Sequence, residues 1–139
     1  MLKKIVHIGV AVRDLEASVR LFTDLYQRGP VHREEVRDQK VLTAMFSSDG
    51  PSLELLQATD HESPIARFIE KWGEGIHHVS FEVDDIETEL QRLSSLGFVL
   101  IDKHPRPGAG GYLVAFLHPR STNGVLIEIG QRMASGYGE

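Results

Sequence analysis

Two stretches of alternating apolar and polar residues lie far apart along the chain, at residues 5–12 and 76–83. Alternate residues of a strand share a face, so this period of two predicts a strand in each stretch. The apolar face of the first strand is aliphatic throughout and consists of Val6, Ile8, Val10 and Val12. The opposite face carries His7 followed by the very small residues Gly9 and Ala11, which is typical of a pocket wall.

The second stretch repeats the first. Its polar face again begins with a histidine, and consists of His78, Ser80 and Glu82. Equivalent residues of the two strands are separated by 71 positions, as are Asp14 and Asp85. Such self-similarity predicts two copies of one structural unit. Farther along, the separation of equivalent residues grows to 74, which places a three-residue insertion around residues 118–124, in a predicted hairpin loop.

Each half of the chain is predicted to form a βαβββ module, with Asp14 or Asp85 as the helix N-cap. We expect helices at 15–27 and 86–96 and a short linking helix at 63–72, opened by Ser63 and Pro64. The remaining strands are expected at 31–37, 40–47, 52–57, 98–103, 112–118 and 125–130. The predicted fold class is therefore α+β, with modules at about 1–60 and 74–132 in a single domain of residues 1–139.

Composition narrows the possible functions. The chain has 139 residues, no cysteine and a formal net charge of −5. Thiolate metal sites, disulfides and cysteine nucleophiles are excluded, and a nucleic-acid surface is not expected without a basic cluster. No apolar run approaches the roughly 20 residues of a membrane span, so we expect a cytoplasmic protein with no membrane partner. Any metal would have to bind histidine and carboxylate.

Two carboxylates are out of place in apolar strands. Glu54 lies within Leu-Glu-Leu-Leu and Glu128 within Leu-Ile-Glu-Ile, 74 residues apart. A carboxylate turned into a sheet concavity is costly unless a cation or several donors meet it. With His7 and His78, the repeat supplies two imidazoles and two carboxylates at equivalent positions, a set that suits Zn, Co, Ni or Mn. For each glutamate alone, the alternative is a solvated sheet face.

The other histidines are weaker candidates. His77 and His78 are neighbours on a predicted strand, so they have opposite strand parity, which means that their side chains lie on opposite faces. His77 is expected to point toward the helices. Solvated positions are expected for His32, His61 and His104. His118 ends a strand and precedes Pro119-Arg120, so His118 and Arg120 are candidates for the pocket rim. The glycine-rich stretch 107–111 does not open a helix, so it is read as a hairpin or lid connection.

The paired modules and the His/Glu/His/Glu set resemble the vicinal oxygen chelate superfamily, which includes glyoxalase I. Several stretches are similar to the methylmalonyl-CoA epimerase family in particular, and the resemblance spans about residues 5–131. These stretches are 63–71, 73–78, 105–111 and 116–121. The resemblance implies a cupped mixed sheet around a metal site, an acyl-CoA substrate and a homodimer.

The resemblance also assigns roles to residues. It implies that His7, Glu54, His78 and Glu128 bind the metal, which stabilises an enolate while a proton moves on and off the substrate α-carbon. Glu128 matches one proposed base of the family, and the partner base falls at Thr43, whose hydroxyl is a poor base. The second proton carrier therefore stays open among Glu82, His118 and a water on the metal. Two alternatives remain, a glyoxalase-I-like isomerase or lyase and a non-catalytic binding module.

Overall fold

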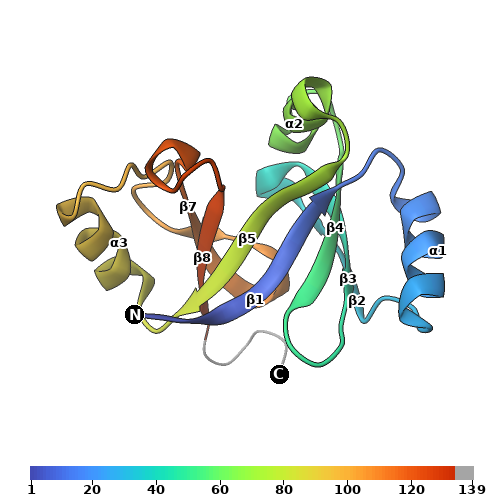
Figure 1. The fold of residues 1–139 in the computed structure, drawn as a ribbon, viewed down its shortest axis with the longest axis horizontal. Helices are drawn as coiled ribbons and strands as arrows, with labels where there is room; N and C mark the ends of the chain where they lie inside the picture. The colour runs from blue at the N-terminus through green and yellow to red at the C-terminus, as the bar shows by residue number, and fades with distance from the viewer. Residues whose placement is uncertain (134–139) are drawn as a thin grey trace. The chain divides into compact units, whose positions relative to one another are not determined.

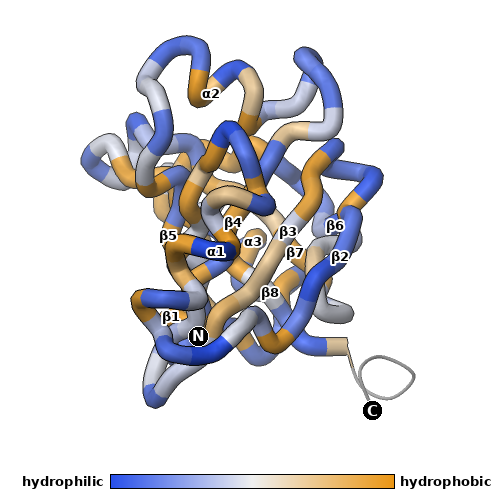
Figure 2. The backbone as a smooth tube through the Cα atoms, turned by 90° about the vertical axis from the view of Figure 1, so that its right-hand side faces the viewer, coloured by the Kyte–Doolittle hydropathy of each residue, from blue (hydrophilic) through white to orange (hydrophobic). Residues whose placement is uncertain are grey.

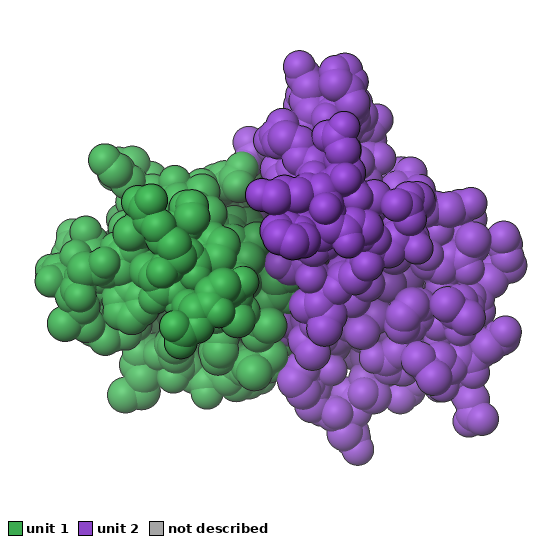
Figure 3. All heavy atoms as spheres, turned by 45° about the horizontal axis from the view of Figure 1, so that its top comes forward, with its two compact units in different colours: residues 1–6, 78–139 green, residues 7–77 purple. Residues whose placement is uncertain are grey.

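The computed structural model describes residues 1–133 and contains two compact units. Unit 1 combines residues 1–6 with the chain from residue 78 onward, and unit 2 comprises residues 7–77 (Figure 3). The units do not follow the sequence repeat at its start, because the first six residues group with the second half of the chain. None of the helices in the described part of the chain has the length and apolar character that a membrane-spanning helix needs.

Unit 2 contains the first sequence module and the linking helix. Its strands lie in the order β2, β3, β4, β1, with β4 parallel to β1 and antiparallel to β3. The elements of this part of the chain are β1 (Leu2–Ala11, of which residues 7–11 belong to unit 2), α1 (Leu15–Tyr26), β2 (His32–Val36), β3 (Val41–Phe46), β4 (Ser52–Ala58) and α2 (Pro64–Trp72) (Figure 1). A short 3-10 turn, Arg37–Gln39, joins β2 to β3.

Unit 1 repeats this arrangement. Its strands follow the order β5, β8, β7, β6, with β8 parallel to β5 and antiparallel to β7. The elements are β5 (Gly75–Val83), α3 (Ile86–Ser95), β6 (Arg106–Pro107), β7 (Tyr112–Leu117) and β8 (Ile127–Arg132), with 3-10 turns at Ala109–Gly111 and Pro119–Ser121. The predicted α+β class with two βαβββ modules is confirmed. The predicted insertion lies in the loop between β7 and β8.

One predicted strand is wrong. Residues 98–103 form no strand, and only an isolated bridge joins Leu100 to Leu117. The regular ladder fails because the side chain of Asp102 accepts the Phe116 N–H at 2.9 Å, where a strand would offer a backbone carbonyl. The strand that pairs with β7 is instead the two-residue β6, which is kept short by Pro107, a residue without an N–H group.

Both helices of the repeat begin in the same way. The predicted N-caps are confirmed, since Asp14 accepts the Ala17 N–H and Asp85 accepts the Thr88 N–H. Each helix start is held a second time by a glutamine from the last strand of its module. The Gln57 side chain accepts the Leu15 N–H at 2.6 Å, and the Gln131 side chain accepts the Ile86 N–H at 2.9 Å. These bonds satisfy helix N–H groups that have no partner within the helix.

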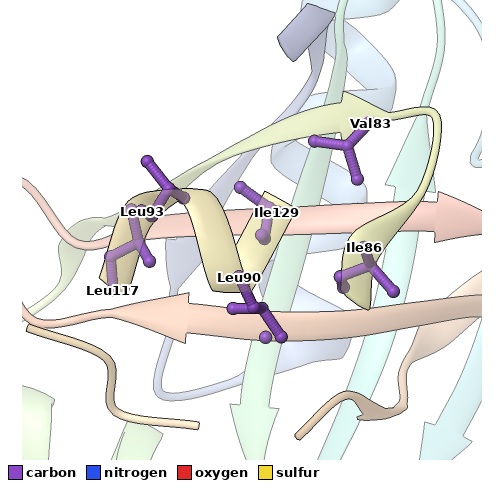
Figure 4. Packing of buried hydrophobic residues seen from close by; sticks show 7 residues of the cluster. Val83, Ile86, Leu90, Leu93, Leu117 and Ile129 are labelled. Carbon is purple, nitrogen blue, oxygen red and sulfur yellow. The ribbon is translucent and has the colours of Figure 1, made fainter. Parts of the chain in front are cut away.

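Each helix covers one apolar strand face, as the alternation predicts. In unit 2, Val12, Leu15, Ala44, Phe46 and Leu55 form the buried core under α1. In unit 1, the equivalent core lies under α3 (Figure 4) and consists of Val83, Ile86, Leu90, Leu93, Ala115, Leu117 and Ile129. The opposite strand faces are left for the polar residues that the sequence analysis selected.

The edge strands of the two units, β2 and β6, differ in the feature that discourages pairing with other chains. β2 carries the sequence His-Arg-Glu-Glu-Val, and Figure 2 shows it largely hydrophilic beside the more apolar β3. Charged side chains on an edge strand discourage unwanted pairing with other chains. At the end of unit 1, β6 is only two residues long. The homodimer that the family resemblance implies stays a prediction.

A buried carboxylate fixes α3. The side chain of Glu89 is only 2% exposed and lies 2.6 Å from the Met1 amino group, and the Arg92 Nε donates to it at 3.1 Å. The hydrogen bond from Arg92 is the main cause of a lowered pKa for Glu89. Because the folded-state pKa lies below the ordinary value of 4.5, the carboxylate stabilises the fold above that pH, and this stabilisation is lost as the pH falls.

We therefore expect Glu89→Gln to lower the free energy of unfolding at pH 7 by about 1–3 kcal/mol, the usual cost of losing a hydrogen bond to a charged group. Urea unfolding followed by circular dichroism measures this difference. The gap between the variant and the wild type should shrink below pH 4.5. Glu87→Gln, an exposed position on the same helix, serves as the control and should change stability little. A gap that stays constant with pH would contradict the role of the Glu89 charge.

Candidate metal-binding and catalytic residues

In unit 2, the first predicted pair of metal ligands is in contact. His7 on β1 and Glu54 on β4 approach each other, with 3.2 Å between His7 Nε2 and Glu54 Oε1. The side chain of Glu54 is 5% exposed and that of His7 is 15% exposed. The register pairs Glu54 with Gly9, two residues beyond His7, so the missing side chain at Gly9 leaves room beside the carboxylate.

In unit 1, the second pair has the same arrangement. His78 on β5 and Glu128 on β8 lie with 3.6 Å between His78 Nε2 and Glu128 Oε1, and both side chains are buried. The ring of Phe116 on β7 meets the His78 ring edge-on, with 5.6 Å between centroids. Phe116 pairs with Glu128 across the strands, so the carboxylate lies beside an aromatic wall. This phenylalanine was not selected from the sequence, since an apolar residue in a strand carries no distinguishing signal.

The spacing within each pair fits a shared metal ion. Two ligand atoms about 2.1 Å from one ion lie about 3.0 Å apart at a right angle and about 3.4 Å apart at a tetrahedral angle. The nitrogen-to-oxygen distances of 3.2 and 3.6 Å are close to this range. Nitrogen from imidazole and oxygen from carboxylate are the donors that divalent transition metals accept. Each pair can therefore supply two ligands to one ion.

Strand parity distinguishes the two neighbouring histidines as predicted. His77 points toward α2, where its ring meets Phe68 edge-on with 5.0 Å between centroids. His78 faces Glu128 on the opposite side of the strand. His32, His61 and His104 are exposed, in agreement with their predicted solvated positions.

Thr43 is buried on β3 and pairs with Leu56 of β4, two pairs along the ladder from the pair that contains Glu54. Its hydroxyl donates to the Glu34 backbone carbonyl at 3.4 Å. A hydroxyl that is held by a carbonyl and has an alcohol's acidity is a poor proton carrier at neutral pH. The geometry therefore favours a packing role for Thr43.

His118 follows β7 and is held by the turn that it begins. Its Nδ1 accepts the Arg120 N–H at 3.1 Å, which in a neutral ring puts the proton on Nε2. His118 has the same strand parity as Phe116, whereas the Arg120 side chain is exposed. His118 therefore extends the polar face of unit 1 with a hydrogen-bond donor, and the rim position expected for Arg120 stays a prediction.

A hydrogen-bond network lies around Glu82, farther along the same face of unit 1, and Glu82 is its only member that the sequence analysis selected. The Tyr112 hydroxyl donates to Glu82 Oε1 at 3.3 Å and accepts from the Arg132 guanidinium at 3.1 Å. Burial is the main cause of a raised pKa for Tyr112, so the phenol stays protonated near neutral pH. Lys3 Nζ lies 3.9 Å from the second oxygen of Glu82. Tyr112 and Arg132 are paired across β7 and β8, a contact that only the strand register could reveal.

A cavity in unit 2 lies away from the predicted metal ligands of that unit. It has a volume of about 400 Å³ and is bounded by α2 and the ends of β1 and β4, including Arg13, Ala58 and Ile69. None of the predicted metal ligands lines it. Its walls combine an apolar floor with oppositely charged side chains, a composition that selects no particular ligand.

Comparisons with known proteins give a consistent result. A family model described as the Glyoxalase/Bleomycin resistance protein/Dioxygenase superfamily matches residues 6–116. The ethylmalonyl-CoA/methylmalonyl-CoA epimerase of Cereibacter sphaeroides is 35% identical over 133 residues, which cover 94% of this chain and 99% of that protein. The mitochondrial methylmalonyl-CoA epimerase of Dictyostelium discoideum is 33% identical over 130 residues, covering 93% of this chain and 78% of that protein.

A solved structure agrees over almost the whole chain. A variant of the Streptomyces coelicolor methylmalonyl-CoA epimerase, in complex with 2-nitronate-propionyl-CoA, superimposes with a TM-score of 0.90. The two sequences are 33% identical, and the match covers 96% of this chain and 97% of that one. At this identity and coverage, the similarity extends beyond the fold to the family.

Proposed function

The chain belongs to the Glyoxalase/Bleomycin resistance protein/Dioxygenase superfamily and, within it, to the methylmalonyl-CoA epimerase family of isomerases, and from this premise we propose that it interconverts (2R)- and (2S)-methylmalonyl-CoA. The observation that carries the proposal is the pair of repeat-related His–Glu contacts, His7 with Glu54 and His78 with Glu128. Buried imidazole and carboxylate at the same positions of both modules support the proposal that the reaction depends on a metal ion.

His7, Glu54, His78 and Glu128 are the proposed ligands of one divalent ion, of the class Co, Zn, Ni or Mn. A bound ion of this kind supplies positive charge that orients the substrate oxygens and stabilises the negative charge of an enolate. Burial of three of the four side chains to 6% exposure or less keeps competing water away from the ligands. The two donor distances, each measured within one unit, support this assignment.

Glu128 is the proposed base on one face of the substrate. Its carboxylate takes the proton as the α-carbon–hydrogen bond breaks, and the electron pair moves into the enolate of the neighbouring thioester. The aromatic wall of Phe116 beside Glu128 excludes water, which strengthens electrostatic interactions at the reacting carbon. Return of a proton to the opposite face of the same carbon gives the other epimer.

The proposal is tested by isotope exchange. Purified protein loaded with metal is incubated with (2R)- or (2S)-methylmalonyl-CoA in deuterated water, and the substrate is followed by proton NMR. We expect deuterium to appear at the α-carbon while the two epimers equilibrate, because a carboxylate base exchanges its proton with solvent. Boiled protein gives the background rate of exchange.

Protein that holds metal but neither inverts nor exchanges this substrate would refute the epimerase assignment. Turnover of the methylglyoxal–glutathione adduct in parallel would then identify the glyoxalase-like alternative. Tight binding of small molecules without turnover of either substrate would identify a binding module.

A further inference from the structure

We propose that Glu82 is the second proton carrier, acting on the face of the substrate α-carbon opposite Glu128. This inference rests on the proposed epimerase function, because inversion at one carbon needs a proton carrier on each side. Both glutamates lie in unit 1, so their relation is set by the strands of one compact unit.

Strand parity and register put Glu82 on the face of the predicted ligands. Glu82 follows His78 and Ser80 at intervals of two along β5, so the three side chains point to the same side. Ser80 pairs with Glu128 on β8, and Glu82 pairs with Gly130, one step farther along the same ladder. Among the residues that the described strands of unit 1 place on this face, Glu82 and Glu128 carry the carboxylates.

The spacing suits a carbon held between the two carboxylates. Neighbouring strands lie about 4.8 Å apart and two residues span about 6.7 Å, so the Cα atoms of Glu82 and Glu128 are separated by about 8 Å. Two carriers in contact with opposite sides of one carbon, each about 3 Å from it, have oxygens about 6 Å apart. Two glutamate side chains at these positions would need to lean toward one another by only about 2 Å in total to reach this separation.

The carboxylate of Glu82 is held in place by its neighbours. Its side chain is 18% exposed, and its oxygens lie 3.3 Å from the Tyr112 hydroxyl and 3.9 Å from Lys3 Nζ. Arg132 donates to the same hydroxyl and lies over the Tyr112 ring, 5.0 Å from its centroid. The hydrogen bond from the Tyr112 hydroxyl therefore fixes where the Glu82 carboxylate lies on this face.

Gly130 makes room for this arrangement. A Cβ atom at position 130 would lie 3.2 Å from Cδ1 of Tyr112, closer than ordinary contact, so the ring packs directly over the glycine backbone. The ring thereby crosses β8 from its own strand, β7, to reach Glu82 on β5. The Tyr112 side chain is fixed at both ends, and it orients the Glu82 carboxylate along the face.

The proposed step is balanced in protons and electrons. Glu128 takes the α-proton and becomes a carboxylic acid, and the electron pair of the broken bond enters the enolate. Protonated Glu82 then gives its proton to the opposite side of the carbon, a new carbon–hydrogen bond forms, and Glu82 becomes a carboxylate. The reverse reaction uses the same two groups in exchanged roles, and exchange with solvent restores either starting state.

The test separates exchange of the α-proton from inversion at the α-carbon. In Glu82→Gln, we expect the rate of interconversion to fall by at least about 10²-fold. One epimer should still exchange its α-proton for deuterium without inverting, because Glu128 can remove and return a proton on its own side. The other epimer should exchange at least 10²-fold more slowly than in the wild type. Proton NMR measures exchange, and a mutase that accepts only one epimer measures inversion.

Tyr112→Phe is the matched control, because it keeps the ring over Gly130 and the Glu82 carboxylate but removes the hydroxyl. It should retain inversion at a reduced rate. Metal content and the thermal unfolding midpoint of Glu82→Gln should equal those of the wild type, which excludes misfolding as the cause.

Three results would overturn the proposal while leaving the epimerase function intact. They are interconversion by Glu82→Gln within tenfold of the wild type, equal loss of exchange from both epimers, and a Tyr112→Phe variant with the exchange-without-inversion pattern, which would identify the phenol as the carrier. A wild type that neither inverts nor exchanges the substrate would instead overturn the proposed function itself, and this inference with it.

Discussion

Replacing Glu128 by glutamine should slow the interconversion of the methylmalonyl-CoA epimers by about 10²–10⁴-fold, the range typical of losing a general base. The amide keeps an oxygen that can bind a metal ion but cannot accept the α-proton. Deuterium exchange should fall by the same factor for the epimer whose α-proton faces Glu128. The rates are measured by NMR in deuterated water, and metal content is measured on the same samples.

Thr43→Val provides the matched control for this variant, since Thr43 is also buried and its hydroxyl is held by the Glu34 carbonyl. We expect its rate to stay within about tenfold of the wild type. A loss as large as that of Glu128→Gln would make the threonine hydroxyl part of a proton relay. Full activity of Glu128→Gln would remove Glu128 from the chemistry.

Purified protein should contain about one divalent metal ion per chain, and His78→Ala or Glu54→Ala should lower this to less than about a tenth of an ion. Each of these buried side chains is a proposed donor, and the carboxylate would also neutralise the ion's charge. Elemental analysis of dialysed protein makes the measurement. The two variants also test the two units separately, because His78 belongs to unit 1 and Glu54 to unit 2.

His77→Ala is the control for the metal prediction. It removes an imidazole one residue from His78, but one that packs against Phe68 and has the opposite strand parity. This variant should keep its metal and lose only packing energy. Metal retained in His78→Ala and lost in His77→Ala would show that the two histidines have exchanged roles, and metal retained in both His78→Ala and Glu54→Ala would refute the site.

Much of the fold and most of the candidate ligands follow from the repeat. Equivalent positions of His7 and His78, and of Glu54 and Glu128, are visible in the sequence because both modules keep the same strand parity. Strand parity also places the side chains of His77 and His78 on opposite faces of the strand. Such patterns are reliable where one strand face packs on a helix and the other does not, because the two faces then need different residues.

The parts that sequence could not predict depend on long-range pairing. The segment 98–103 has the apolar residues of a strand, yet the Asp102 side chain replaces the backbone at one rung of the ladder. The proposed role of Glu82 depends on Tyr112, which reaches it across Gly130 and lies 30 residues away in the sequence. Local propensity carries no information on either contact, because both are set by the register of paired strands.

The glutamines that hold the two helix starts make each module intolerant of a shift in register. Gln57 and Glu54 are three residues apart on one strand, as are Gln131 and Glu128, so amide and carboxylate point to opposite faces. A slip by a single residue would turn the carboxylate into the apolar layer beneath the helix and the amide away from the helix N–H group that it serves. Both changes would destabilise the misaligned strand. The shifted register is therefore disfavoured during folding. An insertion in one module is then tolerated in the loop before its last strand and not within that strand. The second module has its longer loop at this place, between β7 and β8.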